Sequence, residues 1–248
     1  MYEAILFDLY GTLLDIHTDE DSEILWEKMR LFYASKGATY TAESLKEGYH
    51  ALVAEKTEKL SAKGYIHPEC DVKKVFKKLY SNQNIDVKME EVKETARLFR
   101  WLSLDYVKPY DHAIELLNFL KEQNKKIILV SNAQSVFTVP ELKATGLYEY
   151  FDAIYISSDH KISKPNPKYL EKVIKEQKLT KETCLFVGND HRTDVQIANE
   201  IGIDAAYLHT NCSPAIPDTL QTVLTLYDGK LSGLIDFLKS AFSVDIIL

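Results

Sequence analysis

The chain has 248 residues, of which 46% are hydrophobic and 27% charged, an ordinary balance for a globular protein with a sizeable core. Its formal net charge is -7 and it carries neither a basic tail nor a basic stripe, which argues against nucleic acid as a partner. The apolar runs are too short to span a bilayer, so no membrane partner is expected either.

Cys70, Cys184 and Cys212 form neither a CxxC pair nor a pattern with metal-ligand spacing. Such scattered thiols fit a reducing cytoplasm, where we expect all three to be small buried hydrophobic side chains. The N-terminus leads directly into an apolar run without a charged leader or a small-residue cleavage pattern, which predicts no secretory signal. These features together predict a cytoplasmic location.

An apolar run at residues 4–7 breaks at Asp8, shortly before Gly11 and Thr12. A short apolar run bounded by turn residues predicts a strand that is buried on both faces. Open α/β sheets bind their ligands at the carboxyl ends of such strands, which is where Asp8 stands. A lone Asp in this position is more often a helix cap or a solvated loop acid, so a role for Asp8 depends on polar residues further along the chain.

Residues 16–104 differ in character, being rich in Glu, Lys, Leu and Tyr, with apolar residues at helical spacing such as Leu25, Met29 and Phe32. The spacing predicts about four helices that form a small bundle. The lysine pairs at 73–74 and 77–78 are typical of solvated helix faces.

After residue 105, helices and strands alternate. Helical spacing predicts helices at 111–123, 140–145, 168–177, 194–200 and 231–240, and apolar runs predict strands at 127–130, 151–156, 184–187 and 205–208, the last of them closing the sheet. This alternation predicts an α/β protein with a Rossmann-like, doubly wound parallel sheet. The helical segment interrupts the alternation after the first strand. We therefore predict a discontinuous core at 1–15 and 105–248 and an inserted α-helical cap domain at 16–104.

Four of the predicted strands are followed by polar loops. These loops contain Asp8 and Thr12, then Ser131 and Asn132, then Lys164, and finally Asn189, Asp190 and Asp194. Parallel strands bring their carboxyl ends to one edge of the sheet, so these side chains are expected to converge. Each loop alone has an ordinary explanation, such as a helix N-cap at Ser131 or a surface lysine at Lys164. Four such loops in this order favour a functional site.

The set of motifs resembles the haloacid dehalogenase-like hydrolase superfamily, in the branch with a helical cap inserted after the first strand. The motifs are Asp8-Leu9-Tyr10-Gly11-Thr12, Ser131-Asn132, Lys164-Pro165 and Gly188-Asn189-Asp190-His191-Arg192-Thr193-Asp194. The resemblance covers nearly the whole chain. It is specific for the superfamily and much less specific for the substrate, because this fold hosts several chemistries.

The resemblance implies nucleophilic catalysis by a carboxylate on a small-molecule substrate. Asp8 would form a covalent aspartyl ester, which water then hydrolyses. Thr12 and Ser131 would hydrogen-bond the transferring group, and Asn132 would supply a further donor. Lys164 would hold negative charge in place and keep Asp8 ionised, because a nearby cation lowers the pKa of a carboxyl group.

The resemblance also implies Mg²⁺, which phosphatases of the superfamily hold through the nucleophile, a main-chain carbonyl two residues later and an acid after the fourth strand. The ligands here would be Asp8, the carbonyl of Tyr10, and Asn189 or Asp190. Asp194 would lie near the metal without binding it directly. Oxygen ligands of this kind, completed by water and phosphate, are those that Mg²⁺ prefers.

Tyr10 departs from the phosphatase pattern, in which a second Asp protonates the leaving alkoxide and later activates water. A phenol with a reference pKa of about 10 is a weak base at neutral pH. The 2-haloacid dehalogenases of the superfamily carry Tyr at this position, since a halide leaves without a proton. Tyr10 therefore favours dehalogenation, or a phosphatase whose acid is impaired or displaced.

A second departure favours a phosphatase. Those dehalogenases need no metal and receive the substrate anion on an Arg of the first cap helix, but the matching position here is Glu27, with Arg30 one turn from Trp26. A carboxylate there would repel a haloacid anion. The leading hypothesis is thus a Mg²⁺-dependent phosphatase of a small phosphorylated metabolite. The alternatives are a metal-independent 2-haloacid dehalogenase and a catalytically weak, ligand-binding relative.

Overall fold

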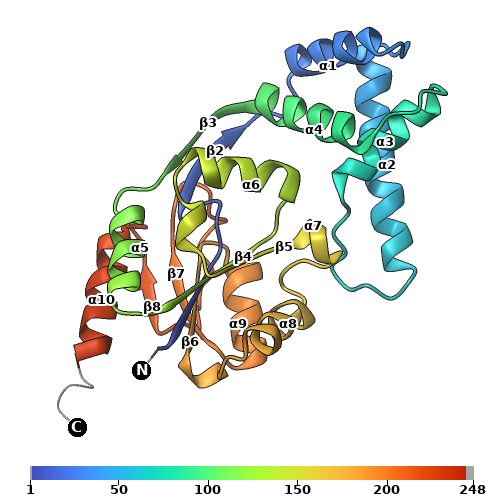
Figure 1. The fold of residues 1–248 in the computed structure, drawn as a ribbon. Coiled ribbons are helices and arrows are strands. Elements are labelled where there is room, and N and C mark those ends of the chain that lie inside the picture. The colour runs from blue at the N-terminus through green and yellow to red at the C-terminus, as the bar shows by residue number, and fades with distance from the viewer. Residues whose placement is uncertain (1, 244–248) are drawn as a thin grey trace.

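A computed structural model describes residues 2–243 of the chain (Figure 1). Within this range six parallel strands form the central sheet, in the order β5-β4-β1-β6-β7-β8. The strands are β1 (Ala4–Phe7), β4 (Lys126–Ser131), β5 (Ala153–Ile156), β6 (Cys184–Gly188), β7 (Asp204–Leu208) and β8 (Leu224–Leu226). The prediction that 205–208 closes the sheet is wrong, because the three residues of β8 follow it and are too few to show a hydrophobic period.

The strands of the sheet are buried on both faces, as the apolar runs predicted. In β1, Ile5 and Phe7 pack on one face and Ala4 and Leu6 on the other. The first face is covered by α5 (Ala113–Glu122) and α10 (Leu231–Ser243), and the second by α8 (Pro167–Gln177) and α9 (Gln196–Ile201). The Rossmann-like, doubly wound core is therefore confirmed. Residues 1 and 244–248 of the predicted core lie outside the described residues.

Helix α6 (Ser135–Ala144) begins five residues before the predicted start at 140. Its first turns contain β-branched residues, which are weak helix formers, and Pro140 lies inside the helix. Packing of Val136 and Phe137 into the core of the cap outweighs that weak propensity. Shorter helical segments complete the core: η1 (Tyr148–Tyr150), α7 (Ser157–His160), η2 (Lys181–Thr183) and a π-helical turn, η3 (His191–Val195).

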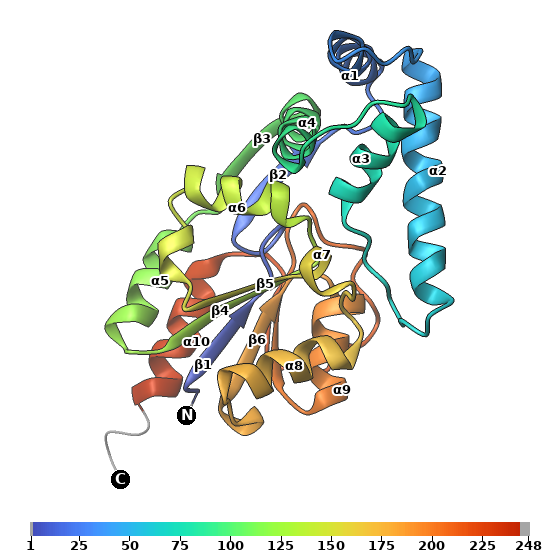
Figure 2. The same ribbon diagram turned by 45° about the vertical axis from the view of Figure 1, so that its right-hand side comes forward.

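Between β1 and β4 the chain forms the predicted helical cap. In the described part of the chain it consists of α1 (Glu23–Ser35), α2 (Ala42–Ser61), α3 (Val72–Asn82) and α4 (Met89–Ser103). Aromatic side chains such as Trp26, Tyr49, Phe76 and Phe99 pack together at its centre. Figure 2 shows these helices grouped at one end of the molecule, away from α5 and α10.

The cap is joined to the core by an antiparallel pair of strands, β2 (Leu14–Thr18) and β3 (Leu104–Pro109), which the sequence did not predict. Both strands are largely half-buried or exposed, so they lack the apolar run that identifies the strands of the core. The paired strands cross the predicted boundaries at 15/16 and 104/105, and those boundaries stay a prediction.

Cys70 and Cys184 are buried, as expected, but the expectation is wrong for Cys212, which is exposed. Cys212 lies in the loop after β7, and its thiol donates to the carbonyl of Ile16 at an S···O distance of 3.7 Å. Across residues 2–243, no helix combines the length and the apolar character needed to cross a membrane.

Candidate active site

The polar loops meet at the carboxyl end of β1, which lies between β4 and β6 in the sheet. The chain passes from one side of β1 to the other here, and such a switch point leaves a crevice between the diverging loops. A cavity of about 190 Å³ occupies it. Its walls are formed by Asp8, Tyr10, Ser131, Asn132, Lys164, Asn189, Asp190, Thr193, Asp194 and Cys212. The structure therefore brings the predicted site residues together, with Thr12 buried directly behind them.

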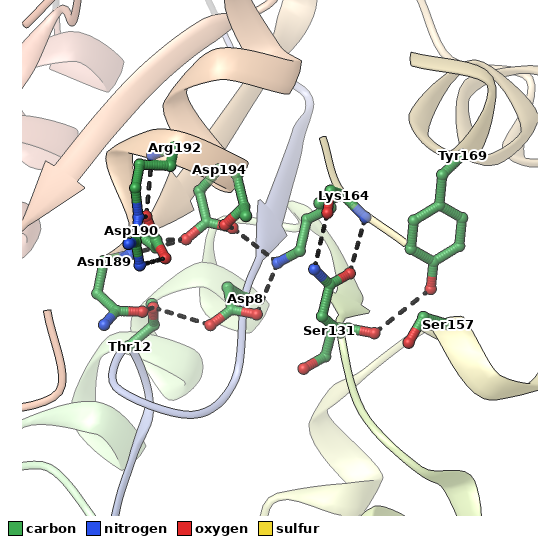
Figure 3. A network of polar contacts seen from close by, with 12 residues as sticks. Asp8, Thr12, Ser131, Ser157, Lys164, Tyr169, Asn189, Asp190, Arg192 and Asp194 are labelled. Atoms are coloured by element: carbon green, nitrogen blue, oxygen red, sulfur yellow. Dashed lines mark hydrogen bonds and ion pairs between the residues drawn. The ribbon is translucent and has the colours of Figure 1, made fainter. Parts of the chain in front are cut away.

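Lys164 lies between two carboxylates at the base of the cavity (Figure 3). Its Nζ donates to Asp8 Oδ1 and to Asp194 Oδ1, both at 2.7 Å, and all three residues are buried. Burial alone lowers the pKa of Lys164, but the charges of Asp194 and Asp8 outweigh it, so the pKa is raised above its ordinary value. Lys164 is therefore an ammonium ion held against both carboxylates.

Asp194 is fixed from its other side by main-chain groups. Its Oδ2 accepts hydrogen bonds from the amides of Asn189 at 3.0 Å and Asp190 at 2.9 Å. Gly188 permits this approach, because a Cβ there would overlap the Asp194 carboxylate. Burial raises the pKa of Asp194, while the Lys164 ammonium acts in the opposite direction. The short π-helical turn thus brings the Asp194 side chain back to the main chain of Asn189 and Asp190.

Asn132 contacts the main chain of Lys164 rather than lying free in the cavity. Its Nδ2 donates to the Lys164 carbonyl at 3.0 Å, and its Oδ1 accepts from the Lys164 amide at 2.8 Å. This pair of bonds orients the Lys164 loop. Ser131, which ends β4, is buried, and its carbonyl accepts from the Tyr169 hydroxyl at 3.5 Å (Figure 3).

Two of the predicted metal ligands, Asp8 and Asn189, lie beside Thr12. Its Oγ1 is 3.4 Å from Asp8 Oδ2 and 3.3 Å from Asn189 Oδ1. Asp190 faces Arg192 instead, whose Nε and Nη2 donate to it at 3.0 and 2.8 Å. Burial tends to raise the pKa of Asp190, but Arg192 outweighs it and the pKa is lowered.

Across residues 2–243 no group of three or more His, Cys, Asp or Glu side chains is arranged to hold a metal. An ion here would therefore depend on the Asp8 carboxylate together with neutral oxygens, those of the Asn189 amide and the Tyr10 carbonyl. This donor set fits Mg²⁺, which takes one or two carboxylates and completes its shell with water and substrate phosphate.

The Tyr10 hydroxyl is bonded to α6. It donates to Glu141 Oε2 at 2.5 Å and lies 3.1 Å from Thr138 Oγ1, and burial raises the pKa of Tyr10 above its ordinary value. Arg100 of α4 contacts the same carboxylate, with Nε 2.6 Å from Glu141 Oε1. Sequence reasoning missed Arg100 and Glu141, because charged residues within helical segments give no sign of a partner on another helix.

Glu27 lies on α1 outside the cavity. It is exposed and pairs with Arg30 at 2.6 Å between Arg30 Nη2 and Glu27 Oε1. Neither residue lines the cavity at Asp8.

Comparison with known proteins gives the same family as the motifs. Among curated proteins, the pyrimidine 5′-nucleotidase PynA of Streptococcus pneumoniae is 22% identical, over 86% of this chain and 89% of its own length. The pyrophosphatase PpaX of Halalkalibacterium halodurans is 33% identical over 40% of this chain and 46% of its own. For several curated relatives, PpaX among them, the match spans only about half of the relative's length.

Solved structures share the fold over almost the entire chain. A 2-haloacid dehalogenase from Pseudomonas syringae has a TM-score of 0.65 at 18% identity, covering 97% of this chain and 99% of that one. A HAD phosphatase from Thermococcus onnurineus has a TM-score of 0.60 at 20% identity, covering 96% and 98%. A sequence model of haloacid dehalogenase-like hydrolases matches residues 2–202, which include all four polar loops, and this chain therefore belongs to the haloacid dehalogenase-like hydrolase family.

Proposed function

We propose that this hydrolase is a Mg²⁺-dependent phosphatase of a small phosphorylated metabolite, with Asp8 as its nucleophile. The observation that carries the proposal is the buried Lys164 ammonium bonded to both Asp8 and Asp194. A cation in this position offsets the negative charge of Asp8, which reduces the repulsion between this nucleophile and an anionic phosphoryl group in the cavity. The curated relatives named as pyrimidine 5′-nucleotidase, pyrophosphatase and glyceraldehyde 3-phosphate phosphatase support the same class of substrate.

In the proposed reaction the Asp8 carboxylate attacks phosphorus and the leaving group departs, after which water hydrolyses the aspartyl phosphate. Thr12 and Ser131 hydrogen-bond the phosphoryl oxygens, and Lys164 balances their charge. Asn132 acts by holding the Lys164 main chain. Asp8, the Tyr10 carbonyl and Asn189 or Asp190 would hold Mg²⁺, which would supply further neutralisation of the negative charge on the phosphoryl group.

The test is phosphate release from a panel of phosphomonoesters and phosphoanhydrides in the presence of Mg²⁺. Asp8→Asn is expected to abolish the release, while the matched control Asp86→Asn, at an exposed position between α3 and α4, keeps it. Failure to release phosphate from every compound, or an Asp8→Asn variant as active as the parent, would refute the proposal.

A metal-independent 2-haloacid dehalogenase is the second candidate. It is favoured by Tyr10, whose hydroxyl is bonded to Glu141 and Thr138, since expulsion of a halide needs no acid. Chloride release from 2-chloropropionate that persists in a metal chelator would establish this activity. The absence of chloride release under the same conditions would exclude that substrate.

A further inference from the structure

The carboxylates that line the cavity at Asp8 are all engaged. Asp8 and Asp194 share the Lys164 ammonium, and Asp194 also accepts two main-chain amides. Asp190 accepts the guanidinium of Arg192 as well as its amide. Among the described cavity residues, no carboxyl group is therefore left to protonate a departing leaving group.

Neither the Tyr10 hydroxyl nor the Cys212 thiol replaces such an acid. The Tyr10 hydroxyl is directed at Glu141 and Thr138 on α6. The Cys212 thiol donates to the Ile16 carbonyl at 3.7 Å. Both groups donate their protons to acceptors within the protein rather than to a leaving group in the cavity.

Two half-buried acids of the cap also lie outside the cavity. Burial raises the pKa of both Glu20 and Glu69, which is the property expected of a general acid. Neither lines the cavity, and the two carboxylate oxygens of Glu69 accept from Ser157 Oγ at 3.0 Å and Gln134 Nε2 at 2.9 Å.

The missing acid restricts the leaving group. An alkoxide is about as strong a base as hydroxide, so it departs slowly unless it is protonated. A carboxylate has a conjugate acid of pKa about 4 and departs without help. General acid catalysis typically increases the rate about 10² to 10⁴-fold. Without it, substrates with alkoxide leaving groups should react much more slowly than substrates with carboxylate leaving groups.

We propose that the substrates of this enzyme are acyl phosphates or phosphoanhydrides, whose leaving group departs as a stable anion. This inference rests on the proposed phosphatase function. In the first step an Asp8 oxygen forms the bond to phosphorus while the bond from phosphorus to the leaving oxygen breaks, and the electron pair leaves on that oxygen. In the second step water attacks phosphorus, the bond to Asp8 breaks, and the proton of water passes to the released phosphate or to solvent.

The experiment measures kcat/KM of the unaltered protein with Mg²⁺ across substrates of graded leaving group. Acetyl phosphate and pyrophosphate represent the proposed class. The leaving groups of 4-nitrophenyl and phenyl phosphate are of intermediate basicity, and those of ethyl and glycerol phosphate are alkoxides. The alkyl phosphates are expected to be about 10² to 10⁴ times slower than acetyl phosphate. Comparable rates across the series would overturn the inference and leave the phosphatase function standing. No turnover of any compound would instead refute the function itself.

Three variants test whether another residue acts as the acid. The readout is the ratio of kcat/KM for acetyl phosphate to kcat/KM for the alkyl phosphates, which does not depend on how much of the protein is folded. Tyr10→Phe, Glu20→Gln and Glu69→Gln are each expected to leave this ratio unchanged. A variant that increases the ratio about tenfold or more would identify its residue as the acid and overturn the inference.

Discussion

The Lys164 ammonium is buried with a carboxylate on either side, so the three side chains together carry a single net negative charge. Each partner depends on the others, because a buried charge without its counterion is strongly unfavourable. The surrounding main chain adds bonds to Asp194 and to the Lys164 backbone, which hold the arrangement before any substrate arrives.

Replacement of this lysine tests that dependence. Lys164→Met leaves Asp8 and Asp194 facing each other without a cation, and we expect a loss of about 3–5 kcal/mol in the free energy of unfolding together with loss of activity. Urea denaturation measures the first and phosphate release the second. The matched control is Lys168→Met on the exposed side of α8, which should change neither. A Lys164→Met protein as stable as the parent would contradict this account of the site.

At the residue scale, the motifs were sufficient to predict which residues meet at the cavity. Asp8, Ser131, Lys164 and Asp194 follow strands that the sequence identifies by their apolar runs, so their convergence could be predicted. The direction of each side chain could not be predicted. The Tyr10 hydroxyl points at Glu141, which is 131 positions away in the sequence, rather than into the cavity. The residues next to Tyr10 in the sequence do not reveal this direction.

At the scale of elements, α4 of the cap is tied to α6 of the core through one carboxylate. Glu141 accepts from Arg100 at 2.6 Å and from Tyr10 at 2.5 Å, and the Arg100 guanidinium lies over the Tyr10 ring at 5.6 Å. Because Tyr10 is two residues from Asp8, this cluster links the cap to the loop of the proposed nucleophile.

Truncation of Glu141 tests this link. Glu141→Ala leaves the half-buried Arg100 without its carboxylate partner and removes the acceptor of Tyr10, so a loss of about 3–5 kcal/mol in unfolding free energy is expected. Tyr10→Phe removes one hydrogen bond to a charged group and should cost about 1.5–3 kcal/mol. Urea denaturation measures both. Glu27→Ala, which breaks an exposed pair on α1, is the control and should have a much smaller effect. Equal effects of Glu141→Ala and Glu27→Ala would refute the link.

The elements also show which patterns a sequence reveals. The core strands are continuous apolar runs and the cap helices repeat apolar residues with a helical period, and both kinds of element were predicted. The strands β2 and β3 are mostly half-buried or exposed and owe their pairing to each other, and β8 has three residues. Such elements are stabilised by residues far away in the sequence, so the local sequence does not predict them.

At the scale of the whole molecule, several contacts join the cap to the core in the described part of the chain. They include the β2–β3 pair, the α4–α6 contact and the loop before α3. In that loop, Gln134 of the core donates to Glu69 and to the Cys70 carbonyl, both at 2.9 Å, and accepts from the Val72 amide at 3.0 Å. Glu69 also accepts from Ser157. A half-buried acid therefore lies directly between cap and core.

The position of Glu69 predicts a pH dependence of stability. Burial raises the pKa of Glu69 in the folded protein, although the hydrogen bonds from Ser157 and Gln134 act in the opposite direction. The folded state then binds the proton more tightly than the unfolded chain, whose Glu pKa is about 4.3. The resulting stabilisation is present below that value and is lost as the pH rises through the folded-state pKa.

Glu69→Gln cannot ionise, so it should lose less stability than the parent as the pH rises above about 4 through the range in which Glu69 of the folded protein ionises. The difference in unfolding free energy between variant and parent, measured by urea denaturation across this range, should therefore shift in favour of Glu69→Gln as the pH rises. Glu58→Gln on the exposed face of α2 controls for the general loss of one carboxylate. A Glu69→Gln difference that stays constant across the range would mean that ionisation of Glu69 does not oppose the docking of the cap. A difference that moves the other way would mean that the ionised carboxylate strengthens the contact, through its bonds to Ser157 and Gln134.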